Sequence, residues 1–197
     1  MVSNSDRYLR ASSESPRFSN RTRSRRFNAS SATWLVDALD VARRDLAAGT
    51  KGPMALAHGD FTHTQLLFDS GSIALIDFDT VCSAEAAVDL GHFMGYLRLV
   101  VSKAANGESS NDLADALCAH FLDTYFAERE AMSPQAADDL RRRASAYELV
   151  SLVRIAGHGW YKLKNERLFH SVSLVRDAVT RVSGYDPGLP VSESVHV

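Results

Sequence analysis

Two short apolar runs in the middle of the chain constrain its fold most strongly. Leu66–Phe68 and Ile73–Ile76 are apolar at every position, and the turn-like tetrad Asp69–Ser72 separates them. This pattern predicts an antiparallel β-hairpin, and its continuous apolar character predicts burial on both faces. A hairpin returns the chain to the place where it started. The segments that enter it after Asp60 and leave it at Asp77 should therefore meet at one end.

Carboxylates flank this predicted hairpin on both sides. The tripeptide His58–Asp60 precedes it, Gln65 enters its first strand, and Ile76–Asp79 closes its second strand. Phosphoryl transfer needs one carboxylate to hold the acceptor hydroxyl and further oxygen ligands to hold Mg²⁺ against the phosphates. The arrangement therefore favours a phosphotransferase site. The alternative is that two loop carboxylates merely end two buried strands.

The remainder of the chain has helical periodicity, so we predict an α+β fold that is mostly helical. Apolar residues recur at helical spacing in five stretches, 34–46, 87–101, 113–125, 140–151 and 168–182. Ser133–Pro134 is a helix-start signal, Gly49 and Gly184 are stop signals, and Gly157 and Gly159 are expected to interrupt the fourth helix. We expect an ordered domain over residues 32–185.

The two ends of the chain differ from this domain in composition. Residues 1–31 are rich in Ser and Arg, carry about +5, and are expected to be disordered, as is the polar tail 186–197. The arginines could contact nucleic acid, but only Tyr8, Phe18 and Phe27 lie among them, and nucleic acid binding is disfavoured. No apolar run approaches the ~18 residues of a membrane span. The two cysteines form no CxxC motif, and a cytoplasmic location is expected.

The segment from His58 to Gly91 resembles the aminoglycoside phosphotransferase family, which is related to choline kinases and more distantly to protein kinases. The family pattern has an HGD loop, a hydrophobic strand, a turn, an IDF or IDW motif and a later Asp-Leu. Here His58–Asp60, Ile76–Asp79 and Asp89–Gly91 supply these parts. The resemblance covers roughly residues 32–183. It implies the C-lobe of a protein kinase-like fold, with ATP and Mg²⁺ as cofactors and a small-molecule hydroxyl as acceptor.

The resemblance also implies roles for individual residues. Asp60 would be the catalytic base and Asp77 the chief Mg²⁺ ligand. Gln65 occupies the position of the family's second metal-holding Asn. It keeps the amide oxygen but is longer by one methylene, so we expect it to be a metal ligand with altered geometry.

Three further residues would support the site. His58 would hold the loop rather than react, and Asp89 would brace the loop from the helical lobe. Asp79 is either a second group around the metal or a solvated carboxylate. Outside the motif, His92, His120 and His158 fall on helical patterns and are expected to pack or to face solvent. The run Arg141–Arg143 is expected to be a solvated helix face.

The part of the chain before the motif departs from the family pattern. No lysine occurs before Lys51, and the segment before Trp34 has no room for the strands of a nucleotide-binding N-lobe. We therefore expect a truncated ATP-dependent phosphotransferase that lacks this lobe and is weak or inactive alone. Two alternatives stay open, a non-catalytic remnant or pseudokinase-like binding lobe, and a split enzyme whose N-lobe comes from another chain.

Overall fold

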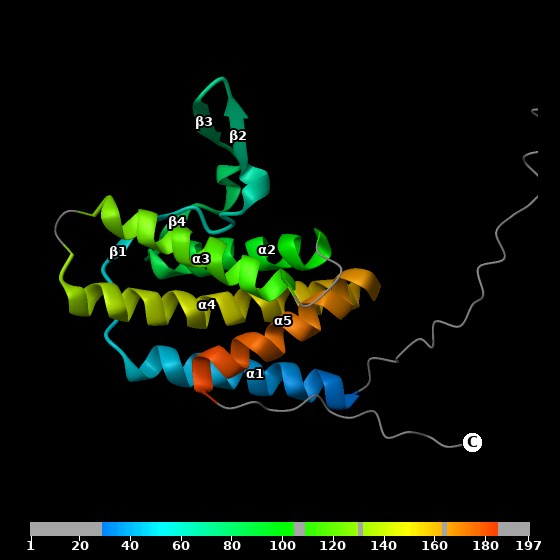
Figure 1. The fold of residues 1–197 in the computed structure, drawn as a ribbon. Helices are drawn as coiled ribbons and strands as arrows, with labels where there is room; N and C mark the ends of the chain where they lie inside the picture. Colours follow the sequence, from blue (N-terminus) through cyan, green and yellow to red (C-terminus); the bar gives the residue numbers. More distant parts are fainter. Residues whose placement is uncertain (1–28, 105–108, 130–131, 163–164, 185–197) are drawn as a thin grey trace, which may run out of the picture.

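The computed structural model describes residues 29–104, 109–129, 132–162 and 165–184, and it confirms a mostly helical α+β fold. The helices are α1 (Ala29–Ala48), α2 (Ala87–Ala104), α3 (Ser109–Ala127), α4 (Pro134–Tyr161) and α5 (Asn165–Ser183), shown in Figure 1. Helix α1 begins at Ala29, three residues before the predicted start of the ordered domain at residue 32. The predicted disordered segment, up to residue 28, and the predicted tail 186–197 lie outside the described residues.

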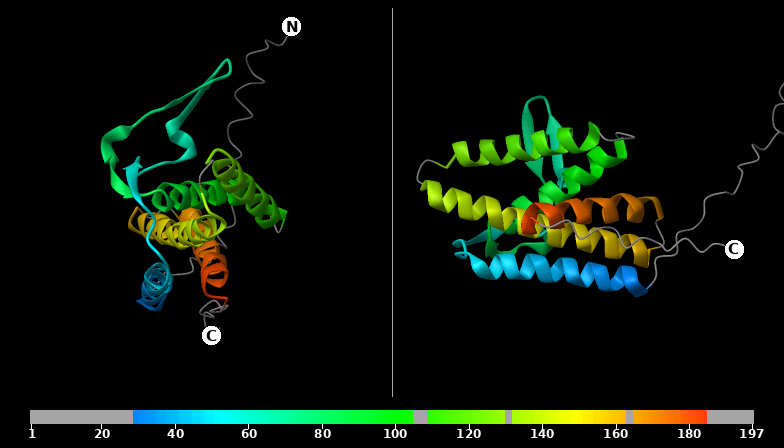
Figure 2. Two further views of the ribbon diagram at one scale, coloured as in Figure 1. Left: turned by 90° about the vertical axis from the view of Figure 1, so that its left-hand side faces the viewer. Right: turned by 60° about the horizontal axis from the view of Figure 1, so that its bottom comes forward.

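Helix α4 is the centre of the helical body. It packs against α1, α2 and α5, and the views in Figures 1 and 2 show these helices around it. Leu149, Leu152 and Ile155 on α4 are at most 1% exposed. Each such side chain contributes roughly 1.5–3 kcal/mol by leaving water. The helical body therefore supplies the rigid support on which the loops between the strands rest.

The two ends of α4 follow the predicted signals in part. Ser133 caps α4 by accepting a hydrogen bond from the Ala136 N–H at 3.2 Å, and Pro134 takes the first helical position. The expectation that Gly157 and Gly159 interrupt the fourth helix is wrong, because α4 continues through both to Tyr161. A Cβ at position 159 would lie 3.3 Å from the Leu168 nitrogen, so this glycine lets α5 approach closely.

The strands form two separate two-stranded sheets. The predicted hairpin is present as β2 (Leu66–Asp69) and β3 (Ser72–Leu75), with Leu66 opposite Leu75. A second pair, β1 (Met54–Ala57) with β4 (Cys82–Glu85), was not predicted. Short 3-10 turns at His63–Gln65 and Phe78–Thr80 connect the hairpin to its surroundings.

The prediction that the hairpin is buried is wrong. Strands β2 and β3 project from the helical body, as both Figure 1 and Figure 2 show. Leu67, Phe68 and Ile73 are between 52% and 71% exposed. Within the described part of the chain, no element lies over these side chains, because the hairpin pairs only with itself and is attached at its foot.

A buried ion pair fixes β4 to the helical body. Glu85 and Arg143 are both under 5% exposed, and the guanidinium donates to both carboxylate oxygens of Glu85. Tyr147 Oη donates to Glu85 Oε1 at 2.6 Å, and Arg143 also donates to the Leu46 carbonyl at the end of α1 at 2.8 Å. The expectation of a solvated face at Arg141–Arg143 is therefore wrong for Arg143, which needs a carboxylate partner to be buried.

The two cysteines lie in opposite environments. Cys118 is buried between α2 and α3, and Cys82 is exposed on β4.

None of the helices in the described ranges is long and apolar enough to cross a bilayer. The cytoplasmic location stays a prediction.

Candidate active site

His58 ties the two halves of the motif together. Its Nε2 donates to the Ile76 carbonyl at 2.9 Å, and its Nδ1 accepts from the Asp60 N–H at 3.3 Å. Since a carbonyl can only accept and an N–H can only donate, the proton of this imidazole is on Nε2. One buried ring thus spans the distance from the Asp60 loop to the residue before Asp77. The role of His58 in a working site stays a prediction.

Asp89, in the first turn of α2, braces the same loop from below. Its Oδ2 accepts from the His58 N–H at 2.6 Å and its Oδ1 accepts from the Gly59 N–H at 2.9 Å. A carboxylate that takes two backbone donors fixes the path of the loop. Asp89 thus contacts the loop from α2, and the role that the resemblance implies for it stays a prediction.

Gly59 lets the loop lie against the segment that leaves the hairpin. Its φ is +80°, and a Cβ at this position would lie 2.4 Å from the Thr80 carbonyl oxygen. Thr80 Oγ1 in turn donates to the His58 carbonyl at 2.8 Å. Both a left-handed backbone and a close approach thus require glycine in the middle of the His58–Asp60 tripeptide.

Asp77 and Gln65 meet at the foot of the hairpin. Asp77 has a left-handed backbone with φ of 65°, and its Oδ2 accepts from Gln65 Nε2 at 3.2 Å. The side chain of Gln65 therefore presents its nitrogen to the carboxylate in this structure. A half turn of the amide would bring the oxygen to the same place. Asp79 is exposed in the following 3-10 turn, and His63 is exposed in the turn before β2.

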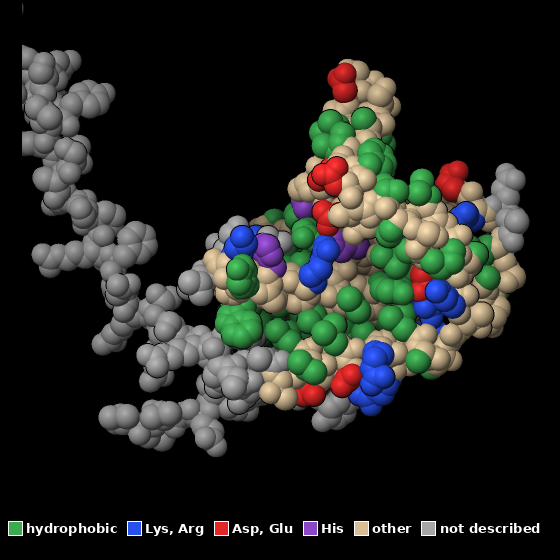
Figure 3. Space-filling model, turned by 180° about the vertical axis from the view of Figure 1, so that it is seen from behind, with side chains coloured by type: hydrophobic (Ala, Val, Ile, Leu, Met, Phe, Trp, Pro, Cys, Tyr) green, Lys and Arg blue, Asp and Glu red, His purple; other side chains and the backbone are tan. Residues whose placement is uncertain are grey.

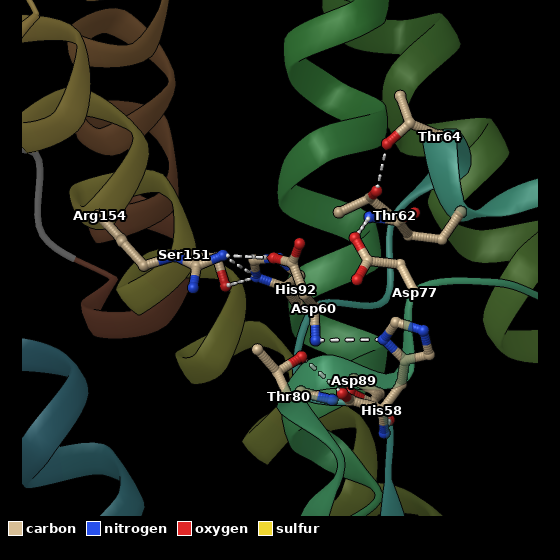
Figure 4. Close-up of polar contacts among 12 residues, drawn as sticks. His58, Asp60, Thr62, Thr64, Asp77, Thr80, Asp89, His92, Ser151 and Arg154 are labelled. Carbon is tan, nitrogen blue, oxygen red and sulfur yellow. Dashed lines mark hydrogen bonds and ion pairs between the residues drawn. The ribbon is translucent and has the colours of Figure 1, made fainter.

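Asp60 is held by side chains from two helices of the body. Its Oδ1 lies 3.0 Å from His92 Nε2 on α2 and 2.9 Å from Arg154 Nη2 on α4. His92 Nδ1 lies 2.9 Å from Ser151 Oγ, so the imidazole links the carboxylate to the buried face of α4. Arg154 Nη2 also lies 2.8 Å from His92 Nε2, so this ring nitrogen contacts both the Asp60 carboxylate, which can only accept, and the guanidinium, which can only donate. Figure 4 shows Asp60 with these partners on one side and Asp77 on the other.

These neighbours determine the charge of the site. Burial opposes the ionisation of Asp60, but the hydrogen bonds from Arg154 and His92 outweigh it and hold its pKa below the ordinary value. Burial, and then the positive charge of Arg154, lowers the pKa of His92 despite the opposing effect of Asp60. At neutral pH the group is therefore an ionised carboxylate between a neutral imidazole and a guanidinium.

His92, Ser151 and Arg154 are site residues that sequence reasoning missed. His92 is buried and packs as expected, but its contact with Asp60 was not predicted. A signal for His92 existed, because it lies three residues after Asp89 on the same helix face. No comparable signal existed for Arg154, which is separated from Asp60 by 94 positions and contacts it through the packing of α4.

Comparisons with known proteins give a family model and weak similarity to solved structures. The model described as the phosphotransferase enzyme family matches residues 4–134. Among solved structures, a Plasmodium vivax ethanolamine kinase is 16% identical with a TM-score of 0.43, and the match covers 73% of this chain. The match covers only 37% of that kinase, so this chain spans well under half of its length. A comparison with curated proteins finds no match.

Proposed function

We propose, because this chain belongs to the phosphotransferase enzyme family, that its site takes part in ATP-dependent phosphoryl transfer to a small-molecule hydroxyl. The observation that best supports this is the ring of His58, which holds the amide of Asp60 and the carbonyl before Asp77 in one frame. A fixed spacing between an acceptor-holding carboxylate and a metal-holding carboxylate is what the chemistry demands.

In the proposed reaction the acceptor oxygen forms a bond to the γ-phosphorus, and the bond from that phosphorus to the β–γ bridging oxygen breaks. ADP leaves, and the hydroxyl proton passes to the carboxylate of Asp60. The ionised state of Asp60 suits it to orient the hydroxyl and accept this proton. The neutral His92 and its partner Ser151 keep the carboxylate facing the site.

The oxygen groups at the foot of the hairpin fit a magnesium ion. Asp77 offers an exposed carboxylate, and Gln65, 3.2 Å away, offers an amide oxygen once its side chain turns. No cluster of three His, Cys, Asp or Glu side chains suited to a metal occurs in the described residues. Mg²⁺ needs no such cluster, because it usually keeps waters and substrate phosphates as its other ligands. When bound, it would neutralise charge on the phosphates.

The finer parts of the proposal concern the whole enzyme. A nucleotide-binding N-lobe, supplied by further chain or by another polypeptide, would complete the phosphate site. The non-catalytic binding lobe is the competing function, and the experiment below separates the two.

The test is a titration with Mg²⁺·ATP while thermal unfolding is followed. We expect the melting temperature to rise, since ligand at 100 times its Kd adds about 2.7 kcal/mol of stability. Asp77→Ala should abolish the rise, because it removes the carboxylate that holds the metal. Asp69→Ala, an exposed carboxylate at the tip of the same hairpin, is the matched control and should leave the rise unchanged.

Transfer itself is measured by ³¹P NMR with a panel of hydroxyl compounds. ADP formation that depends on acceptor and on Asp60 would support the enzyme. An unchanged melting temperature at millimolar Mg²⁺·ATP, or an equal rise in Asp77→Ala, would contradict the proposed function and favour the non-catalytic lobe.

A further inference from the structure

Arg154 determines what can sit beside Asp60 on the acceptor side. Its Nη2 lies 2.9 Å from Asp60 Oδ1, while its side chain is 54% exposed. A hydroxyl poised for transfer must reach the Asp60 carboxylate, and it then comes within reach of this guanidinium. Any charge that the acceptor carries near its hydroxyl therefore interacts electrostatically with the Arg154 guanidinium.

The exposed face of α4 beyond Arg154 carries no carboxylate. His158, Tyr161 and the positively charged Lys162 follow at spacings of four, seven and eight residues, and all three are exposed. No Asp or Glu occurs between Arg154 and Lys162. Glu148, the acidic residue one and a half turns earlier, is 1% exposed and is paired with Arg98 and Arg181. Figure 3 shows Lys or Arg, Asp or Glu, and His side chains close together below the projecting hairpin.

A positively charged acceptor would be disfavoured at such a surface. Arg154 is already committed to the Asp60 carboxylate, so the pair is neutral and offers no excess negative charge to an ammonium group. Asp89 is also committed, to the backbone of the loop. The exposed carboxylates Asp77 and Asp79 lie on the hairpin side, where Mg²⁺ is proposed to bind. The exposed charge on the α4 side of Asp60 is therefore that of the Arg154 guanidinium.

We propose that the acceptor is a hydroxyl compound with a carboxylate or phosphate group, and that Arg154 binds this anionic group. The inference rests on the proposed function, because it names the substrate class of the same site. A guanidinium recognises such anions with two parallel N–H donors. As Arg154 turns toward the ligand, Asp60 Oδ1 keeps its contact with His92 and loses the one with Arg154. One arginine thus pairs with the base in the free protein and with the anionic group once the ligand is bound.

The anion could also be the transferred phosphate of the nucleotide, but the position of Arg154 favours the acceptor. Arg154 belongs to α4 in the helical body, whereas the metal-holding residues Asp77 and Gln65 belong to the foot of the hairpin. Figure 4 shows Arg154 and Asp77 on opposite sides of Asp60. The nucleotide phosphates should lie on the side of Asp77, which leaves Arg154 to the acceptor.

The experiment compares three four-carbon alcohols that differ only in charge, using the full chain. These are 4-hydroxybutyrate, 1,4-butanediol and 4-amino-1-butanol, each titrated by ¹H–¹⁵N NMR to obtain Kd. We expect 4-hydroxybutyrate to bind at least 10-fold more tightly than the other two. Arg154→Gln should remove this preference by weakening the binding of 4-hydroxybutyrate, and Arg154→Lys should restore part of it. Arg141→Gln, on the same helix and paired with Asp123, is the control that should keep the full preference.

Several results would overturn the inference. These are equal affinity for the three alcohols, a preference that survives in Arg154→Gln, and no binding of 4-hydroxybutyrate at tens of millimolar. A parallel titration with Mg²⁺·ATP tests whether Arg154 binds the anionic group of the acceptor or the phosphate of the nucleotide. If Arg154→Gln weakens Mg²⁺·ATP binding but not 4-hydroxybutyrate binding, Arg154 serves the nucleotide and the acceptor assignment fails. An anion preference without any response to Mg²⁺·ATP would instead contradict the proposed function and leave the anion site standing.

Discussion

Gly59 and Gly71 share a left-handed backbone but differ in their surroundings. Gly59 has φ of +80° and faces the Thr80 carbonyl, whereas Gly71, at the hairpin tip with φ of +88°, has open space around its Cα. We expect Gly71→Ala to cost about 1–2 kcal/mol for the backbone conformation alone. Gly59→Ala should cost at least about 1 kcal/mol more, because its Cβ would lie 2.4 Å from the Thr80 oxygen.

Urea unfolding of the two variants measures this difference. Because Gly71→Ala carries the same conformational cost, it serves as the control, and the excess in Gly59→Ala reports the contact between loop and strand. Equal costs would show that the loop can move away from Thr80, and that the frame around Asp60 is looser than the structure describes.

At the residue scale, the sequence predicts the roles that depend on nearby positions. His58, Asp60 and Asp77 lie within 20 residues, and a hairpin between them determines how they meet. Arg154 and Ser151 reach the site from α4, and their placement depends on how α4 packs against α2. Tertiary packing of this kind leaves no periodic trace in a single sequence, which is why these residues were missed.

Two glycines show what the packing of whole helices demands. A Cβ at Gly91 on α2 would lie 2.4 Å from the Ala144 carbonyl oxygen of α4, so the two helices touch through their backbones. Gly157 on α4 has nothing within 4 Å of the same position. We expect Gly91→Ala to destabilise the protein by about 1–3 kcal/mol by overpacking. Gly157→Ala should stabilise it by about 0.5–1 kcal/mol, since alanine favours the helix.

Thermal and urea unfolding of both variants tests this contrast. The two substitutions are chemically identical and both lie in long helices, so helix propensity cancels between them. A stabilising Gly91→Ala would show that α2 and α4 can separate without cost, contrary to their close approach here.

At the element scale, local patterns predict what an element is but not what covers it. The apolar runs of β2 and β3 correctly predicted a hairpin, because pairing and turn lie within ten residues. Its burial was predicted wrongly, since exposure depends on elements elsewhere. The β1–β4 pair was missed because each strand has only four residues and the partners are separated by the whole motif. The predicted interruption of the fourth helix at Gly157 was wrong because an otherwise favourable helix tolerates an isolated glycine.

At the scale of the whole molecule, Glu85 couples stability to pH. Burial opposes its ionisation, but hydrogen bonds from Arg143, Tyr147 and the Gly52 N–H lower its pKa from 4.5 to about 2. The pKa of Glu85 is lower in the folded state than in the unfolded state. Its contribution to the free energy of unfolding is therefore present above about pH 4.5 and is lost as pH falls toward 2. A shift of this size corresponds to about 3 kcal/mol.

We expect Glu85→Gln to destabilise the protein by about 3–5 kcal/mol at pH 7, because it leaves the Arg143 charge buried without a partner. Between pH 4.5 and 2 the variant should lose less further stability than the wild type, so the two curves converge. Urea unfolding over this range is the measurement. Asp123→Asn, at an exposed pair with Arg141, should stay within about 1 kcal/mol of wild type at every pH. Parallel curves for Glu85→Gln and wild type would show that another carboxylate governs acid unfolding.

The two cysteines differ in reactivity, so a thiol reagent can label one of them selectively. Burial raises the pKa of the Cys118 thiol to about 11, so almost no thiolate forms there at neutral pH. Cys82 is exposed and lies two residues beyond Thr80, close to where the hairpin rejoins the body. A maleimide dye would therefore attach at one native position beside the site, with no engineering of the chain. Alkylation of Cys118 would in turn report how often the helices α2 and α3 open to solvent.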